Sequence, residues 1–140
     1  MFSTAIPRRA PLGDRFEQPV RDVMRPGVIV ISEDASVAQA QRALLAHNVH
    51  AILVLDSTGK PLGWATSSGL LAFAERDTGL LTARDAVSEA AIVLESSASV
   101  REAIDVMRKE SVTRVVISGH YGCVPEGVVA EHDLLAAVIR

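Results

Sequence analysis

The residues best suited to chemistry in this chain lie at one turn between a strand-like and a helix-like segment. In Gly127–Leu135, which reads GVVAEHDLL, a run of β-branched residues leads through Glu131, His132 and Asp133 into leucines. This change of pattern predicts a strand that enters a helix at a polar turn. An ionised carboxylate at such a turn can accept strong hydrogen bonds from a ligand. Asp133 is therefore the first candidate binding residue.

The chain contains this layout twice, because Gly63–Leu71 (GWATSSGLL) resembles Gly127–Leu135. The repeat extends beyond these segments: shifting residues 20–56 by 63 positions, the step from Ser36 to Ser99, aligns several identical pairs. The pairs are Arg21-Asp22 with Arg84-Asp85, Ile29-Val30 with Ile92-Val93, Ala35-Ser36-Val37 with Ala98-Ser99-Val100, Ala40 with Ala103, and Val49 with Val112. Such a period indicates two copies of one structural unit.

Local signals predict the order helix, strand, helix, strand, strand, helix in each copy. The longer helices begin at capping boxes, Ser36-x-x-Gln39 and Ser99-x-x-Glu102, in which each side chain binds a free backbone N–H group. Their apolar stripes are Val37, Ala40 and Leu44 in one copy, and Val100, Ala103, Ile104 and Met107 in the other. The remaining predictions are opening helices at Arg21–Met24 and Arg84–Val87, with strands at Val28–Ile31, Ala51–Leu55 and Leu62–Thr66, and at Ile92–Leu94, Arg114–Ser118 and Gly127–Ala130.

A unit of this size is marginal alone, since it buries only roughly 60% of its unfolded surface. We therefore expect an α/β fold with α+β character, in which two pseudo-symmetric units, each a small β-sheet with flanking helices, pack sheet to sheet. Two equivalent clefts should lie where strands end and helices begin. The predicted division is a tail at 1–19, a first domain at 20–80 and a second at 81–140. The proline-containing tail should become ordered only by docking on another surface.

Composition limits the class of protein. The net charge of −3 and the scattered basic residues argue against nucleic acid as the main partner. The single cysteine, Cys123, excludes an internal disulfide and fits a reducing compartment. No apolar run approaches the ~20 residues of a membrane span, and residues 1–10 have no signal-peptide pattern. These features predict a soluble cytoplasmic protein.

The repeated pattern resembles a tandem pair of CBS domains, the regulatory domain type first named in cystathionine β-synthase. The resemblance rests on A-S-V-x-x-A at the start of each long helix, on RDVM at Arg21–Met24 and on G-x-x-x-x-x-D-L-L within Gly127–Leu135, and it covers Val20–Ile139. It implies a stand-alone regulatory module with no fused enzymatic domain. It also implies a homodimer that responds to a small molecule and passes the signal to an unidentified protein partner.

The resemblance further implies an adenosine-type regulatory ligand, such as AMP, ADP, ATP or S-adenosylmethionine, and no permanent cofactor. In the family, apolar strand residues surround the adenine, a Thr or Ser ends the strand near the ribose or phosphate, and an Asp three residues later accepts hydrogen bonds from the ribose hydroxyls. The ligand-binding residues carried over to this chain are Asp133, Arg114, His132, Val115, Val116 and Ile92 in the second copy, and Thr66, Ser68 and Ile52 in the first.

Neither copy has the complete motif. The second copy has the acid, Asp133, but Ala130 takes the place of the hydroxyl residue. The first copy has the hydroxyl, Thr66, but Gly69 takes the place of the acid. Arg114 keeps an arginine that is frequent in the family and that could reach a phosphate. We therefore expect a single bound nucleotide to occupy the second cleft.

Simpler interpretations of the two charged residues stay open. Asp133 could serve only the helix start, where a negative charge contributes about 0.3–1 kcal/mol. Arg114 could instead pair with Glu110 or Glu131 on the surface, and such pairs contribute less than about 1 kcal/mol.

The sequence predicts neither a metal site nor catalysis. His120, Cys123 and His132 include metal-binding side chains, but a lone H-x-x-C is too small a ligand set. The chain has no G-x-S-x-G elbow, no Walker-type loop and no H-E-x-x-H motif. We therefore expect no enzyme.

Two rival functions are to be weighed. One is a ligand-free dimerisation and protein-interaction module, in which side chains such as Trp64 or Tyr121 fill the clefts. The other is a nucleic-acid binder, which requires a continuous basic face.

Overall fold

The computed structural model describes residues 12–76, 79–119 and 125–139. The elements of the first copy are β2 (Val30–Ser32), α2 (Val37–Ala46), β3 (Ala51–Leu55), β4 (Pro61–Thr66) and α3 (Ser67–Leu71). Those of the second copy are β6 (Val93–Glu95), α4 (Val100–Glu110), β7 (Arg114–Ser118), β8 (Pro125–Ala130) and α5 (Glu131–Ile139). Shorter elements precede each copy: α1 (Leu12–Glu17), the 3-10 turn η2 (Val20–Asp22) and β1 (Arg25–Pro26), then the 3-10 turn η3 (Ala83–Ala86) and β5 (Glu89–Ala90).

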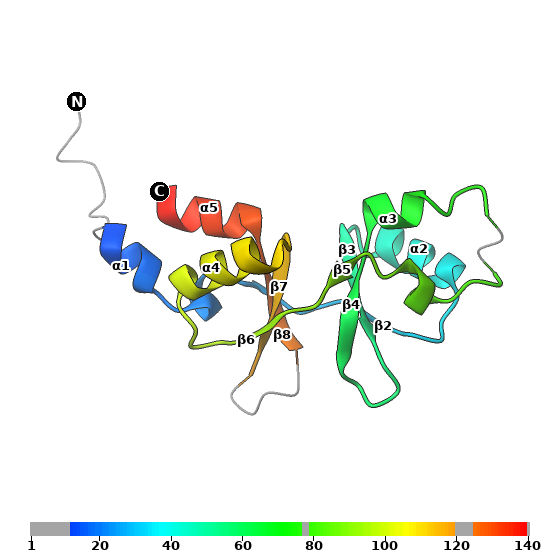
Figure 1. Cartoon of the computed structure of the whole chain (residues 1–140), viewed down its shortest axis with the longest axis horizontal. Helices are drawn as coiled ribbons and strands as arrows, with labels where there is room; N and C mark the ends of the chain where they lie inside the picture. The colour runs from blue at the N-terminus through cyan, green and yellow to red at the C-terminus, as the bar shows by residue number, and fades with distance from the viewer. Residues whose placement is uncertain (1–11, 77–78, 120–124, 140) are drawn as a thin grey trace.

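The elements form two lobes, each a four-stranded sheet with helices on its outer side (Figure 1). The sheet orders are β2-β3-β4-β5 and β1-β8-β7-β6. In each sheet one parallel pair, β2 with β3 or β6 with β7, is followed by antiparallel pairs. The inner faces of the two sheets meet between the lobes. The predicted α/β fold of two pseudo-symmetric units packed sheet to sheet is confirmed.

The segment that opens each copy joins the sheet of the other copy. Strand β1 pairs with β8, with Arg25 opposite Val128, and β5 pairs with β4, with Glu89 opposite Trp64. Val20 is correspondingly buried in the core of the second copy. The predicted opening helices are short 3-10 turns in the structure, each beginning one residue earlier than expected. The division at residues 80 and 81 remains a prediction about the sequence repeat.

The two long helices begin as their capping boxes predict. Ser36 Oγ accepts a hydrogen bond from Gln39 N at 3.0 Å, and Gln39 Oε1 accepts one from Ser36 N at 2.8 Å. Ser99 and Glu102 repeat the arrangement in the second copy, where Ser99 Oγ accepts from Glu102 N at 3.1 Å. These reciprocal bonds satisfy backbone donors that a helix start leaves free. The N-termini of both helices are therefore stabilised by residues only three positions apart in the sequence.

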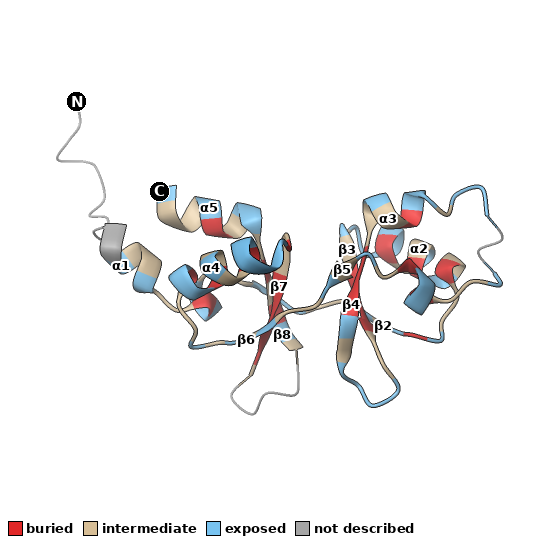
Figure 2. Cartoon of the chain, viewed as in Figure 1, coloured by how far each residue is buried: buried red, intermediate tan, exposed pale blue. Residues whose placement is uncertain are grey.

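Apolar side chains form three clusters, one beneath each helical layer and one between the sheets. Alternation along β7 divides its residues, since Val115 and Ile117 face the helices and Val116 faces the other sheet. Leu53 and Trp64 meet Val116 from the first copy. In Figure 2 the buried residues lie along the central strands and on the helices that cover them. Successive strand side chains point to opposite faces, so each central strand supplies two clusters.

The end of the N-terminal tail docks on the second copy. Helix α1 lies beside α4 and α5 (Figure 1). Arg101 Nε donates to Glu17 Oε1 at 2.8 Å, and the Arg101 guanidinium carbon lies 4.9 Å from the centroid of the Phe16 ring. The first eleven residues lie outside the described part of the chain. The helical layer of the second copy thus carries an extra helix, while α2 and α3 expose Leu45 and Leu71.

Candidate functional site

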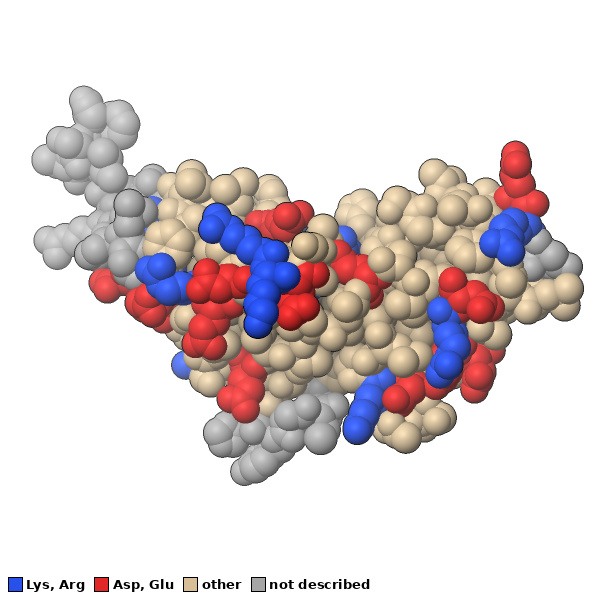
Figure 3. All heavy atoms as spheres, viewed as in Figure 1, with Lys and Arg blue, Asp and Glu red and all other residues tan. Residues whose placement is uncertain are grey.

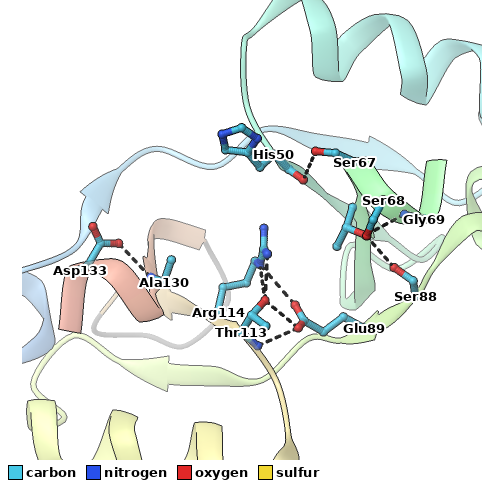
Figure 4. Close-up of polar contacts among 11 residues, drawn as sticks. His50, Ser67, Ser68, Gly69, Ser88, Glu89, Thr113, Arg114, Ala130 and Asp133 are labelled. Carbon is cyan, nitrogen blue, oxygen red and sulfur yellow. Dashed lines mark hydrogen bonds and ion pairs between the residues drawn. The ribbon is translucent and has the colours of Figure 1, made fainter. Parts of the chain in front are cut away.

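Asp133 lies in the first turn of α5 and is held by two contacts. Its Oδ2 accepts a hydrogen bond from the backbone N–H of Ala130 at 2.9 Å, which fixes the carboxylate at the strand-to-helix turn (Figure 4). Its Oδ1 accepts a hydrogen bond from Arg25 Nε at 3.2 Å. The Asp133 side chain is 10% exposed and that of Arg25 is 68% exposed. The helix-start role is therefore real, and one carboxylate oxygen faces a cation at the surface.

Arg114 lies at the start of β7 in a separate polar cluster. Its Nε lies 3.3 Å from Glu89 Oε2, in an ion pair without hydrogen-bond geometry, and its Nε and Nη2 atoms both donate to Thr113 Oγ1. Glu89 Oε1 accepts from the Thr113 backbone N–H at 2.7 Å and from its hydroxyl at 2.8 Å. Figure 4 shows this cluster apart from Asp133. Because Glu89 belongs to β5 in the sheet of the first copy, its carboxylate ties the two copies together.

Trp64 lies between the sheets beside this cluster. The Arg114 guanidinium carbon is 5.9 Å from the centroid of the Trp64 ring, within cation–π range. The indole is buried, and Trp64 Nε1 has no hydrogen-bond partner among the described residues. The Arg114 side chain is only 19% exposed. Its positive charge is therefore already matched by Glu89.

The corresponding turn of the first copy carries hydroxyl groups. Thr66 Oγ1 accepts a hydrogen bond from Gly69 N at 3.1 Å, and it lies 3.1 Å from Ser88 Oγ and 3.3 Å from Ser68 Oγ. Ser67 Oγ donates to the backbone carbonyl of His50 at 2.9 Å (Figure 4). A Cβ atom at Gly69 would lie 2.9 Å from Ser88 Oγ. An acid could occupy the Gly69 position only if Ser88 moved.

The apolar residues predicted to surround an adenine fall on two faces. The Ile52 and Val115 side chains are fully buried beneath the helices, and Ile92 packs against the same core as Val115. Val116 faces the space between the sheets, and its backbone N–H donates to the Ile92 carbonyl at 2.8 Å. Of these four, Val116 alone presents its side chain to the inter-sheet side.

His132 lies away from the inter-sheet space. It lines an open groove of about 860 Å³ between α1, α4 and α5, whose walls also include Phe16, Ile104 and Leu135. No group of three or more His, Cys, Asp or Glu side chains suited to a metal occurs in the described ranges, and His120 and Cys123 lie outside them. Tyr121 also lies outside them.

Four residues that make the contacts in these polar clusters were not among the predicted site residues: Arg25, Ser88, Glu89 and Thr113. Arg25 and Ser88 stand 63 positions apart, at the repeat spacing, so they occupy matching places in the two copies. That spacing is the one signal in the sequence that relates them. Their contacts arise because each opening segment joins the sheet of the other copy, which the repeat does not reveal.

Charge and hydropathy provide two further observations. On the face shown in Figure 3, Lys and Arg side chains are interspersed with Asp and Glu. Within the part of the chain that the structure describes, no helix is both long enough and apolar enough to cross a membrane.

The fold and the repeated strand-to-helix turns are those of a tandem CBS pair. The chain matches the CBS domain family at residues 20–76 and 83–140 and belongs to that family, a class of regulatory module. It is 27% identical over 126 residues to hypoxic response protein 1 of Mycobacterium tuberculosis, covering 86% of this chain and 88% of that protein.

Two solved structures extend the comparison of the fold. The CBS domain of the bacterial CNNM/CorC family Mg²⁺ transporter, in complex with ATP, matches with a TM-score of 0.79 and 17% identity, covering 91% of this chain and 92% of the other. Hypoxic Response Protein I with two coordinated zinc ions matches with a TM-score of 0.69 and 23% identity, covering 85% of this chain and 98% of the other.

Proposed function

We propose that this CBS pair is a regulatory module that binds an adenosine-type ligand mainly at the second copy, with Asp133 accepting hydrogen bonds from the ribose hydroxyls. One observation carries the proposal. The Asp133 carboxylate is fixed by Ala130 N–H, and its other oxygen accepts from Arg25, whose side chain is largely exposed. An ionised carboxylate in this position is a strong acceptor for a diol. The ATP complex of a CBS domain with the same fold supports the ligand class.

Asp133 lies where β8 passes into α5 and contacts the opening segment of the chain through Arg25. Asp133 belongs to α5, which follows β8 directly, while Arg25 belongs to the segment that leads from α1 to the first copy. A ligand at Asp133 would therefore contact the connection between the two copies. It can change their arrangement only as far as it binds one arrangement more tightly than another.

The test is calorimetric titration of the full chain with AMP, ADP, ATP and S-adenosylmethionine. Asp133→Ala should weaken binding about 10- to 150-fold, the equivalent of losing about 1.5–3 kcal/mol of charge-assisted hydrogen bonding. Asp133→Asn keeps an oxygen that can accept from Ala130 N–H, so it tests the loss of the negative charge while the helix start stays intact. Glu131→Ala removes an exposed carboxylate from the same turn and should leave affinity unchanged. No heat with any of the four ligands at millimolar concentration would refute the proposal.

A second candidate is a ligand-free dimerisation and interaction module. The buried Trp64 indole between the sheets favours it, because that side chain occupies space at the inter-copy seam. The exposed Leu45 and Leu71 side chains on α2 and α3, 77% and 74% accessible, favour a homodimer through the helical layer of the first copy. Leu45→Glu combined with Leu71→Glu should convert a dimer to a monomer in sedimentation velocity. Leu80→Glu, which changes an exposed leucine outside both helices, is the control.

A further inference from the structure

The ion pair between Arg25 and Asp133 joins a fixed anion to a cation that can leave. The Asp133 carboxylate is tethered through Oδ2 to Ala130 N at 2.9 Å and is 10% exposed. The Arg25 side chain is 68% exposed and contributes one hydrogen bond, from Nε to Oδ1 at 3.2 Å. Water can solvate the largely exposed guanidinium once it leaves, whereas the 10% exposed carboxylate needs another hydrogen-bond donor in its place. A ligand that replaced Arg25 at Oδ1 would therefore meet little resistance.

The backbone keeps Arg25 beside the second-copy turn even if its side chain moves. Strand β1 pairs with β8, with Arg25 opposite Val128 and Pro26 opposite Gly127, and Gly27 N donates to the Glu126 carbonyl at 2.8 Å. The approach is close, since a Cβ atom at Gly127 would lie 2.6 Å from the Arg25 carbonyl oxygen. The guanidinium can therefore change partners without the strand leaving the sheet.

Arg25 is a better phosphate partner than the arginine expected from the sequence. Arg114 is 19% exposed and paired with Glu89, so a phosphate would have to displace a buried carboxylate. Arg25 is also paired with a carboxylate, but its side chain is 68% exposed, so its guanidinium can turn to a phosphate once a ligand hydroxyl takes its place at Asp133. In the first copy the matching position holds Ser88, whose hydroxyl lies 3.1 Å from Thr66 Oγ1. The two copies therefore differ in charge at equivalent places.

We propose that Arg25 exchanges partners when a nucleotide binds and so makes the second-copy site selective for phosphorylated adenosine. This inference rests on the proposed function of Asp133. A ribose hydroxyl takes over Oδ1 of Asp133, and the released guanidinium forms charge-assisted hydrogen bonds to the phosphate, for which its planar fork is suited. A nucleoside must also break the ion pair, but it has no phosphate with which the released guanidinium could form hydrogen bonds.

The test compares adenosine with AMP, which differ only in the phosphate, by calorimetry on the full chain. Arg25→Ala should weaken AMP binding about tenfold or more, because a charge-assisted contact is lost. The same variant should strengthen adenosine binding up to about fivefold, because the competitor for Asp133 is gone. Opposite shifts of the two ligands are the expected signature. Arg25→Lys, which keeps the charge but loses the fork, should fall between wild type and Arg25→Ala for AMP.

Arg21→Ala removes an exposed arginine from the preceding turn and should leave both affinities unchanged. Thermal melting of each variant verifies that it is folded, and Arg25→Gln replaces Arg25→Ala if the latter is not. If Arg25→Ala changes adenosine and AMP in the same direction, or changes neither, partner exchange is refuted while the proposed function stands. If the wild-type chain binds neither adenosine nor AMP, partner exchange is refuted, and the titrations with ADP, ATP and S-adenosylmethionine decide the proposed function separately.

Discussion

Replacing Glu89 by alanine should destabilise the protein strongly, because one carboxylate serves both copies. It accepts two hydrogen bonds from Thr113, at 2.7 and 2.8 Å, and pairs with Arg114 at 3.3 Å. Hydrogen bonds to charged groups contribute about 1.5–3 kcal/mol, and removing one member of a fully buried pair costs about 3–5 kcal/mol. The two charged side chains keep 13% and 19% exposure, so water restores part of the loss. We expect a decrease of about 2–4 kcal/mol in the free energy of unfolding.

The measurement is urea denaturation followed by far-UV circular dichroism, with thermal melting as a second readout. For a chain of this length, 1 kcal/mol shifts Tm by about 3 °C, so Glu89→Ala should lower Tm by about 10 °C. Glu89→Gln keeps an oxygen that can accept from Thr113 N–H and should lose less. Glu17→Ala is the matched control, since Glu17 pairs with Arg101 at 2.8 Å but both side chains are more than half exposed. It should cost less than about 1 kcal/mol.

A Glu89→Ala variant no less stable than Glu17→Ala would refute the conclusion that this carboxylate ties the copies together. Equal losses for Glu89→Gln and Glu89→Ala would show instead that the negative charge, rather than the acceptor for Thr113, accounts for the effect. Combining Glu89→Gln with Arg114→Gln in a double-mutant cycle measures the coupling of the pair directly.

Substitutions at four further positions test other parts of the structure. Ser99→Ala removes the hydroxyl that caps the start of α4 and should lower the free energy of unfolding by about 0.5–2 kcal/mol in urea denaturation. An unchanged midpoint would contradict a stabilising role for the capping box. Ser111 ends α4 at φ 54°, so Ser111→Gly should raise stability by up to about 1 kcal/mol, and a loss would show that its hydroxyl matters more than strain. Trp64→Ala should cost about 3–5 kcal/mol, and Trp64→Phe clearly less because Trp64 Nε1 lacks a partner; equal losses would contradict that reading. The pKa of Asp56 lies below its ordinary value, chiefly because the Thr58 hydroxyl donates a hydrogen bond to the carboxylate and, second, because the Lys60 backbone N–H does. The stability that the ionised Asp56 contributes is therefore full above the unfolded-state pKa and is lost as pH falls through the lower folded-state pKa. Carboxyl NMR titration should find the lowered pKa, and Thr58→Val should reduce the shift.

Features that depend on neighbouring residues were predictable from the sequence. The capping boxes at Ser36 and Ser99 formed as predicted, because their partners lie three residues away on the same helix. The boundaries of β3 and β7 were also predicted, since their β-branched runs are bounded by turn residues. The duplication led to the CBS family, because a repeated pattern limits the fold more than one copy does. Strand β2 begins two residues later than predicted, as element boundaries rest on weaker local signals.

Which side chains meet could be seen only in the folded structure, because it depends on which distant strands pair. Arg25 reaches Asp133 across 108 positions, and Glu89 reaches Thr113 across 24, because β1 and β5 each join the sheet of the other copy. The sequence left Glu110 and Glu131 open as surface partners of Arg114, whereas its ion pair is with Glu89. Periodicity reports the local path of the backbone, but the partner of a charged side chain depends on which distant strands pair. The sequence thus supplied the acid at the second-copy turn, and the pairing of β1 with β8 placed an exposed arginine beside it.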